Sequence, residues 1–282
     1  MTRQRLNRRQ SSAPPGRWLG GVALGLALAL AMGGAGRGWT APNPALPSAS
    51  PLPTTPLPLA APVPPAGPMP PADPIPLEGP AGQRLLLRAS ARADHGPLAQ
   101  WFETQANLAY CGVASAVMAL NSLAVPAPPV PGYGTYRFWT QTNAFAIPGS
   151  RGFVRPETVA REGMTLAQLH GWLAAAPELV VERIHGDRLS LAQWRALLRR
   201  SLQDPGDRLL VNYFRPALGQ RGGGHISPLA AYDPASDKVL ILDVARYRYP
   251  AVWVSAVDLW TAMGAVDASA GRSRGLLLIR RR

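Results

Sequence analysis

One cysteine and four histidines are the residues of this chain that could carry nucleophilic chemistry. Cys111 follows the polar segment 105–110 and precedes an apolar run, 113–120, with helical spacing. At the start of a helix the helix dipole stabilises a thiolate, which is the nucleophilic form of cysteine. With no second cysteine, an intrachain disulfide and a multi-thiolate metal cluster are excluded, so Cys111 is a free thiol. A lone cysteine is more often a small buried apolar residue, so a catalytic role for Cys111 depends on the residues around it.

The histidine that suits a general base is His225. His95 lies at the edge of a proline-rich stretch, His170 lies on a predicted helix, and His185 lies in a Gly-Asp turn. His225 instead follows the glycines 222–224 and opens an apolar strand, where the glycines leave a substrate access to the imidazole. A strand histidine satisfied within the core is the competing interpretation.

Two further polar residues complete a candidate site. Asp243 closes the apolar run 239–242, and a carboxylate at the end of a buried strand is costly without a partner. It could orient His225, because the turn between the strand that His225 opens and the strand that Asp243 closes allows the two strands to be neighbours; alternatively it caps a turn or pairs with Arg246. Gln105, upstream of Cys111, could place its amide beside the cysteine N–H as an oxyanion hole, or be an ordinary loop glutamine.

The elements that must position these residues change character along the chain. Apolar residues at helical spacing come first and short β-rich runs come later, which predicts an α+β domain of two segregated layers with a mostly antiparallel sheet. The predicted helices are 111–123, 165–175 and 190–202, and the predicted strands are 208–214, 225–232, 238–244 and 275–280.

The N-terminal part divides into two segments ahead of a catalytic domain at residues 81–282. Residues 1–40 combine arginines with an apolar run, which is typical of a signal peptide or membrane anchor. Residues 41–80 hold sixteen of the 31 prolines and should form an extended linker. We therefore expect export, to the periplasm or the outer face of the cytoplasmic membrane.

The formal net charge of +13 does not indicate a nucleic-acid partner. The basic residues are dispersed rather than gathered into runs, and Lys238 is the only lysine. Attraction of small anionic molecules remains compatible with this charge.

Three ordered motifs carry a resemblance to a known family: residues 105–115, residues 224–228, and residues 241–250 with Trp253. Together they resemble the catalytic domain of phytochelatin synthases over residues 84–282. The resemblance implies a papain-like cysteine protease fold, with the cysteine at a helix N-terminus, and a triad of Cys111, His225 and Asp243 with Gln105 at the oxyanion.

The resemblance also implies a substrate and the residues that bind it. Asp267 and Arg274 are expected to bind the γ-glutamyl ammonium and carboxylate of glutathione, and Gly224 and Arg246 complete the expected substrate-binding set. The short length and the single cysteine resemble the bacterial members, for which hydrolysis of glutathione with weak phytochelatin synthesis is implied. We expect no resident cofactor and no protein metal site; a heavy-metal ion would enter only as a metal–glutathione thiolate substrate.

Two other classes of function remain open at this point. A triad does not define a substrate, so an exported papain-like peptidase that cuts peptides is one alternative. A non-catalytic module that binds thiols or metal–glutathione complexes is the other. The oligomeric state does not follow from these residues.

Overall fold

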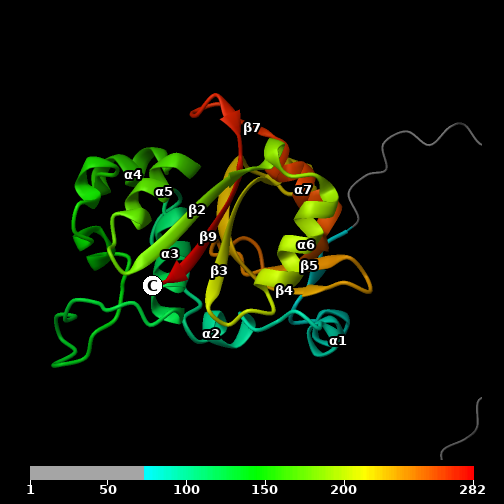
Figure 1. The fold of residues 1–282 in the computed structure, drawn as a ribbon, viewed down its shortest axis with the longest axis horizontal. Helices are drawn as coiled ribbons and strands as arrows, with labels where there is room; N and C mark the ends of the chain where they lie inside the picture. The colour runs from blue at the N-terminus through cyan, green and yellow to red at the C-terminus, as the bar shows by residue number, and fades with distance from the viewer. Residues whose placement is uncertain (1–72) are drawn as a thin grey trace, which may run out of the picture. The chain divides into compact units, whose positions relative to one another are not determined.

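The computed structural model describes residues 73–282, apart from the side chain of Arg151 (Figure 1). The predicted signal or anchor at 1–40 and most of the predicted linker at 41–80 lie outside the described residues. No helix within 73–282 is long and apolar enough to cross a bilayer.

A seven-stranded antiparallel sheet is the centre of the domain (Figure 1). Its strand order is β1-β6-β5-β4-β3-β9-β2. The strands are β1 (Ile75–Pro76), β2 (Leu179–His185), β3 (Asp207–Phe214), β4 (Gly224–Asp233), β5 (Lys238–Ile241), β6 (Val252–Ser255) and β9 (Gly275–Arg281). A separate two-stranded ribbon pairs β7 (Val266–Asp267) with β8 (Arg272–Ser273).

Seven α-helices and four short 3-10 helices accompany the sheet in the described part of the chain. The α-helices are α1 (Pro80–Arg88), α2 (His95–Gln100), α3 (Cys111–Ser122), α4 (Pro156–Glu162), α5 (Leu166–Ala174), α6 (Leu191–Ser201) and α7 (Ala256–Gly264). The 3-10 helices are η1 (Asn143–Ala146), η2 (Ser150–Gly152), η3 (Gly186–Arg188) and η4 (Arg215–Leu218).

The starts of α5 and α6 follow from local sequence. Thr165 and Ser190 each accept a hydrogen bond from the backbone N–H three residues later, and the Gln side chains there, Gln168 and Gln193, accept one back from the cap N–H. These reciprocal bonds satisfy N–H groups that the first helical turn leaves unpaired. The three predicted helices are confirmed with ends displaced by at most one residue.

Helices cover both faces of the sheet, so the prediction of two segregated layers was wrong (Figure 1). Alternate residues of β3 and β9 point to opposite faces, as the period of a strand requires. Leu210 and Leu277 pack with α3 and α5, whereas Leu209 and Leu276 pack with α6 and α7. The coarser prediction, mixed helices with an antiparallel sheet, is confirmed.

Two elements depart from the expected order of helices first and strands later. β2 lies between α5 and α6 in the chain yet pairs with β9 at the C-terminus. α7 interrupts the strand-rich half and packs beside η4 and β3. The strand that β2 pairs with and the surface that α7 covers both depend on residues far apart in the chain. The sequence pattern, which reflects neighbouring residues, therefore missed both.

The globular domain begins earlier than the expected boundary at residue 81. Ile75 and Pro76 form β1 at the sheet edge opposite Trp253 and Val252, and α1 starts at Pro80. A proline is tolerated in an edge strand because one side of that strand needs no hydrogen bond. Residues assigned to the linker at 73–80 therefore belong to the folded unit.

Candidate active site

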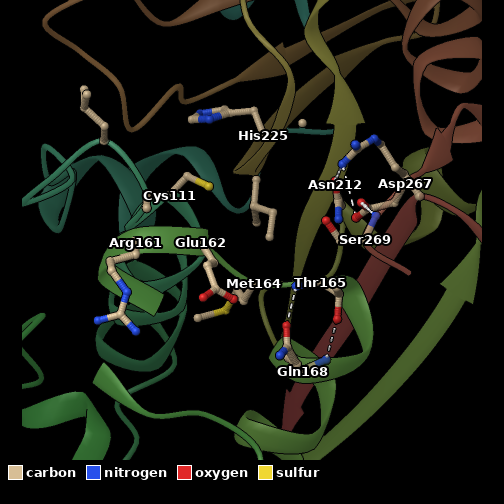
Figure 2. Close-up of a pocket in the computed structure, with 16 residues that line it drawn as sticks. Cys111, Arg161, Glu162, Met164, Thr165, Gln168, Asn212, His225, Asp267 and Ser269 are labelled. Atoms are coloured by element: carbon tan, nitrogen blue, oxygen red, sulfur yellow. Dashed lines mark hydrogen bonds and ion pairs between the residues drawn. The ribbon is translucent and has the colours of Figure 1, made fainter. Parts of the chain in front are cut away.

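A cavity of about 480 Å³ opens beside the start of α3 (Figure 2). Its volume falls within the range of small-molecule sites. Side chains from α3, α4, β3, β4 and the β7 region line it, together with the loop segments between them. They are Leu108, Ala109, Cys111, Arg161, Glu162, Gly163, Met164, Thr165, Gln168, Asn212, Gly224, His225, Ile226, Asp267, Ser269 and Arg274.

Cys111 is the first residue of α3 and is half-buried in the cavity wall. Its position matches the sequence prediction of a cysteine at a helix start. The next residue, Gly112, lies against Met164: a β-carbon there would lie 2.7 Å from the sulfur of that side chain. The glycine therefore lets the segment after α4 pack closely on the start of α3.

His225, in β4, connects the thiol to a carboxylate. It lines the same cavity as Cys111 and lowers the pKa of that thiol, and its Nε2 lies 2.9 Å from Oδ1 of Asp243. The ring of Tyr213 meets the imidazole edge to face, with centroids 5.6 Å apart, from the neighbouring position on β3. The structure thus brings Cys111, His225 and Asp243 into one line of contacts.

Asp243 is fully buried just beyond the end of β5, and several groups bind its carboxylate oxygens. Arg215 contacts both carboxylate oxygens, at 2.8 and 3.0 Å. Tyr213 donates a hydrogen bond from its hydroxyl at 3.2 Å, and the N–H of Ala245 donates another at 2.9 Å. The arginine partner is therefore Arg215 rather than Arg246, the nearer one in sequence.

These contacts set the protonation of the three groups. Burial would raise the pKa of the Cys111 thiol, but the hydrogen bond and charge of His225 outweigh it and lower the pKa. Burial would lower the pKa of His225, but the hydrogen bonds with Asp243 and Cys111 raise it. Burial opposes ionisation of Asp243, yet His225 and Arg215 hold the pKa of this carboxyl well below its usual range. The site therefore favours a thiolate beside an imidazolium.

Gln105 is buried but does not line the cavity. Its amide nitrogen donates to the carbonyl oxygen of Asn107 at 2.7 Å and lies 3.2 Å from the hydroxyl of Tyr247. Its own N–H donates to the carbonyl of Val244, the residue after Asp243. The structure thus ties the Gln105 loop to the segment carrying the carboxylate, with both amide hydrogens engaged.

Asp267 and Arg274 meet at the opposite end of the cavity from α4 (Figure 2). Nη1 of Arg274 lies 3.4 Å from the Asp267 carboxylate and donates to Oδ1 of Asn212 at 2.9 Å. A β-carbon on Gly224 would lie only 2.1 Å from that Nη1. The absence of a side chain at Gly224 is therefore what leaves room for the guanidinium.

Arg246 is the one expected substrate-binding residue that lies elsewhere. It stacks over the ring of Phe102, 4.6 Å from the centroid, and lines a second hollow beside Tyr247 and Arg248. It is not among the residues of the cavity that holds Cys111. Its sequence position near Asp243 suggested proximity, but the chain turns away after Ala245.

Several side chains of the site were missed by the sequence analysis. Asn212 accepts a hydrogen bond from Arg274, and Arg215 forms an ion pair with Asp243. Arg161 and Glu162 line the α4 end of the cavity. Asn212 within the apolar run of β3 was the one available signal, because a buried polar residue in a strand requires a partner. Among residues 73–282 no group of three or more His, Cys, Asp or Glu side chains is placed to hold a metal ion.

An α+β domain in which a helix-start cysteine, a histidine and a buried aspartate lie in contact beside a cavity has the side chains of a thiol-dependent acyl-transfer enzyme. The chain belongs to the phytochelatin synthase family. The family's sequence model, Phytochelatin synthase, matches residues 67–276, well over half of the chain.

Curated relatives agree with that membership. Glutathione gamma-glutamylcysteinyltransferase 1 of Lotus japonicus is 33% identical over 184 residues, which cover 65% of this chain and 35% of the relative. The protein of the same name from Triticum aestivum is 34% identical over 185 residues, 66% of this chain and 35% of the relative. The glutathione gamma-glutamylcysteinyltransferase of Schizosaccharomyces pombe is 27% identical over 201 residues, 70% of this chain and 47% of the relative. The chain thus spans between a third and a half of the length of these relatives.

Proposed function

We propose that this chain transfers the γ-glutamylcysteinyl group of glutathione through a thioester on Cys111. The observation that carries the proposal is a single cavity lined by Cys111 and by His225, which pairs with Asp243, and whose far end holds Asp267 and Arg274. The family membership and the names of the relatives supply the substrate. We further propose that the fold is papain-like, since the cysteine-bearing helix packs on the strands near the histidine and aspartate.

The chemistry starts with proton transfer from the Cys111 thiol to His225. The thiolate attacks the carbonyl carbon of the Cys-Gly amide; the C–S bond forms, the C–N bond breaks, and the imidazolium gives its proton to the glycine nitrogen. Water or an amine then attacks the thioester, gives a proton to His225, and releases the thiolate of Cys111. Water gives hydrolysis, and the amine of a second glutathione gives phytochelatin.

The oxyanion would be held by the N–H of Cys111 and the amide of Gln105. Both amide hydrogens of Gln105 have partners in the structure, Asn107 and Tyr247. Gln105 would therefore have to exchange one of these bonds for the oxyanion during the reaction.

The γ-glutamyl end of the substrate suits the charged end of the cavity. An ammonium is complementary to Asp267, and a carboxylate is complementary to the planar fork of Arg274. Nη1 of Arg274 and Oδ2 of Asp267 lie 3.4 Å apart. A zwitterionic amino-acid group would give each of them a partner of opposite charge.

The remaining parts of the proposal concern location and metals. We propose that residues 1–40 direct the domain out of the cytoplasm and that residues from 41 onward separate it from the membrane. We propose no resident cofactor. A heavy-metal ion would take part as a metal–glutathione thiolate substrate, and metal detoxification would follow from phytochelatin synthesis.

The test is an assay of the full chain with glutathione, with and without cadmium, and separation of the thiol products. The expected products are glycine and γ-glutamylcysteine, with a smaller amount of phytochelatin. Cys111→Ala and Cys111→Ser should lower glycine release by several orders of magnitude. New N-termini from peptides without glycine release from glutathione would show a peptidase instead, and wild-type turnover by Cys111→Ala would overturn the mechanism.

A further inference from the structure

The cavity has a second charged end, formed by the last turn of α4. In Figure 2, Arg161 lies to the left of Cys111, while Asn212 and Asp267 lie to the right. Arg161 and Glu162 line this end, and neither has a role in the proposed chemistry so far. The reacting thiol of Cys111 thus lies between two charged ends.

Arg161 differs from the other arginine of the cavity in its partners. Arg274 is buried and already bonded to Asp267 and Asn212. Arg161 is exposed, and among the described residues it takes part in none of the ion pairs. It is therefore the arginine of this cavity that can meet a ligand anion without first giving up a protein partner.

Contacts at both ends of α4 connect it to the segment that carries the nucleophile. At the first residue of the helix, the carbonyl of Pro156 accepts a hydrogen bond from the hydroxyl of Tyr110, which directly precedes Cys111. After the helix, Gly163 turns the chain with a φ of 72°, a conformation that favours glycine. Met164 then packs on Gly112. These contacts give Arg161 a defined place relative to Cys111.

With the γ-glutamyl end of the substrate at Asp267 and Arg274, the leaving and attacking groups would lie on the α4 side of Cys111, and they share one chemical feature. When the Cys-Gly amide breaks, the leaving nitrogen belongs to glycine and carries a carboxylate one carbon away. When a second glutathione attacks the thioester, its nitrogen is the α-amine of glutamate and also carries a carboxylate one carbon away. Transfer to that amine is the chemical reverse of glycine release, so one subsite can recognise both.

We propose that Arg161 is a specificity-determining residue that binds the α-carboxylate next to the nitrogen that leaves or attacks. The enzyme would thereby select donors that end in a free amino acid and acceptors that are free α-amino acids. Glu162 adds a negative charge on the same wall, so the two side chains together complement a zwitterionic amino acid. This inference rests on the proposed function and extends it to the other half of the substrate.

The test compares two donors with the full chain: glutathione and its C-terminal amide, which lacks only the negative charge of the glycine carboxylate. Wild type should prefer glutathione in kcat/KM by about tenfold, as a solvent-accessible charged contact permits. Arg161→Gln should bring the preference close to unity by slowing glutathione alone, and Arg161→Lys should recover part of it. Arg155→Gln, an exposed arginine at the start of α4 that does not line the cavity, is the matched control.

The acceptor side is tested with the same proteins by adding glycine or glycinamide and measuring its incorporation opposite the thioester. Arg161→Gln should lower transfer to glycine and leave transfer to glycinamide unchanged. A donor preference unchanged in Arg161→Gln would overturn the proposal, and so would an equal loss with both donors, which indicates a structural role. If wild type processes neither donor, the proposed function itself fails.

Discussion

At the scale of single residues, the reactive state of Cys111 depends on His225 and Asp243. Burial by itself would raise the pKa of the thiol, but His225 lowers it, and the pKa of His225 is itself raised. The imidazole is in turn protonated because Asp243 ionises easily, with Arg215 contacting both of its oxygens. His225 shifts the pKa of Cys111, Asp243 shifts that of His225, and Arg215 shifts that of Asp243, each toward the ionised form.

This dependence predicts the pH profile of alkylation. Iodoacetamide should label Cys111 well below pH 8.5, about the pKa of a free thiol, because the lowered pKa leaves a thiolate there. His225→Ala removes the hydrogen bond and the charge of the histidine, which lower the pKa of the thiol, so the midpoint should move to higher pH. His170→Ala, a histidine of α5 outside the cavity, should retain the wild-type profile. A midpoint that His225→Ala does not move would contradict the assigned pair.

Arg215 and Asp243 form a buried ion pair, with 4% and 0% of their side chains exposed. Removing one partner of such a pair leaves an unpaired buried charge and costs about 3 to 5 kcal/mol. Asp243 has a depressed pKa in the folded state, so its contribution to stability is present above the unfolded-state pKa of about 3.9 and is lost as the pH falls through the folded-state value.

Arg215→Gln should therefore destabilise the protein by that amount at pH 7. Because the substitution raises the folded-state pKa of Asp243, the gap from wild type should narrow at acid pH, once the carboxyl of the variant takes up a proton. Urea unfolding of the full chain at a series of pH values measures both effects. Arg84→Gln, an exposed arginine of α1, is the control. A loss below 1 kcal/mol at pH 7 would show that Arg215 does not stabilise the buried charge.

At the scale of elements, the charged end of the cavity is built across three neighbouring strands, β4, β3 and β9. Gly224 opens β4, and Arg274 directly precedes β9, with its guanidinium where a β-carbon of Gly224 would lie. The neighbouring strand β3 supplies Asn212, opposite Gly275 in the register, as an acceptor for the same guanidinium. Strand register, rather than any single residue, brings these groups together.

Two adjacent glycines provide a matched test of that packing. Gly224→Ala should displace the Arg274 guanidinium and lower kcat/KM for glutathione by at least about tenfold, since a charged contact in a largely desolvated place is lost. Gly223→Ala should stay within about twofold, because no atom lies within 4 Å of its β-carbon position. Gly224→Ala combined with Arg274→Ala should be no worse than Arg274→Ala alone. Full additivity would show that the two act separately.

At the scale of the whole molecule, the basic and apolar N-terminal segment predicts where the domain works. A reporter that functions only after export, fused behind Arg282, should be active in cells. The fusion point suits this design, because the last two residues, at the end of β9, are exposed. The same fusion without residues 1–40 should be inactive. Activity of the shortened fusion, or of a reporter that works only in the cytoplasm, would contradict export.

The sequence by itself determined the parts of this protein that depend on neighbouring residues. The helix starting at Cys111 followed from an apolar period, and the pairing of β4 with β5 followed from two short apolar runs joined by a turn at Asp233. These features arise from contacts between residues a few positions apart, where side-chain period and turn chemistry are legible. They sufficed to place His225 and Asp243 on neighbouring strands, and the resemblance of the three motifs to a known family implied that Cys111 joins them.

Only the tertiary structure decided the features that depend on residues far apart in the chain. Arg215, 28 residues before Asp243, holds that carboxylate, whereas Arg246, three residues after it, turns away onto Phe102. Arg161 reaches the cavity because α4 is attached to the segment around Cys111. Such contacts are set by strand register and by the face on which each helix packs, and a residue's type does not encode either.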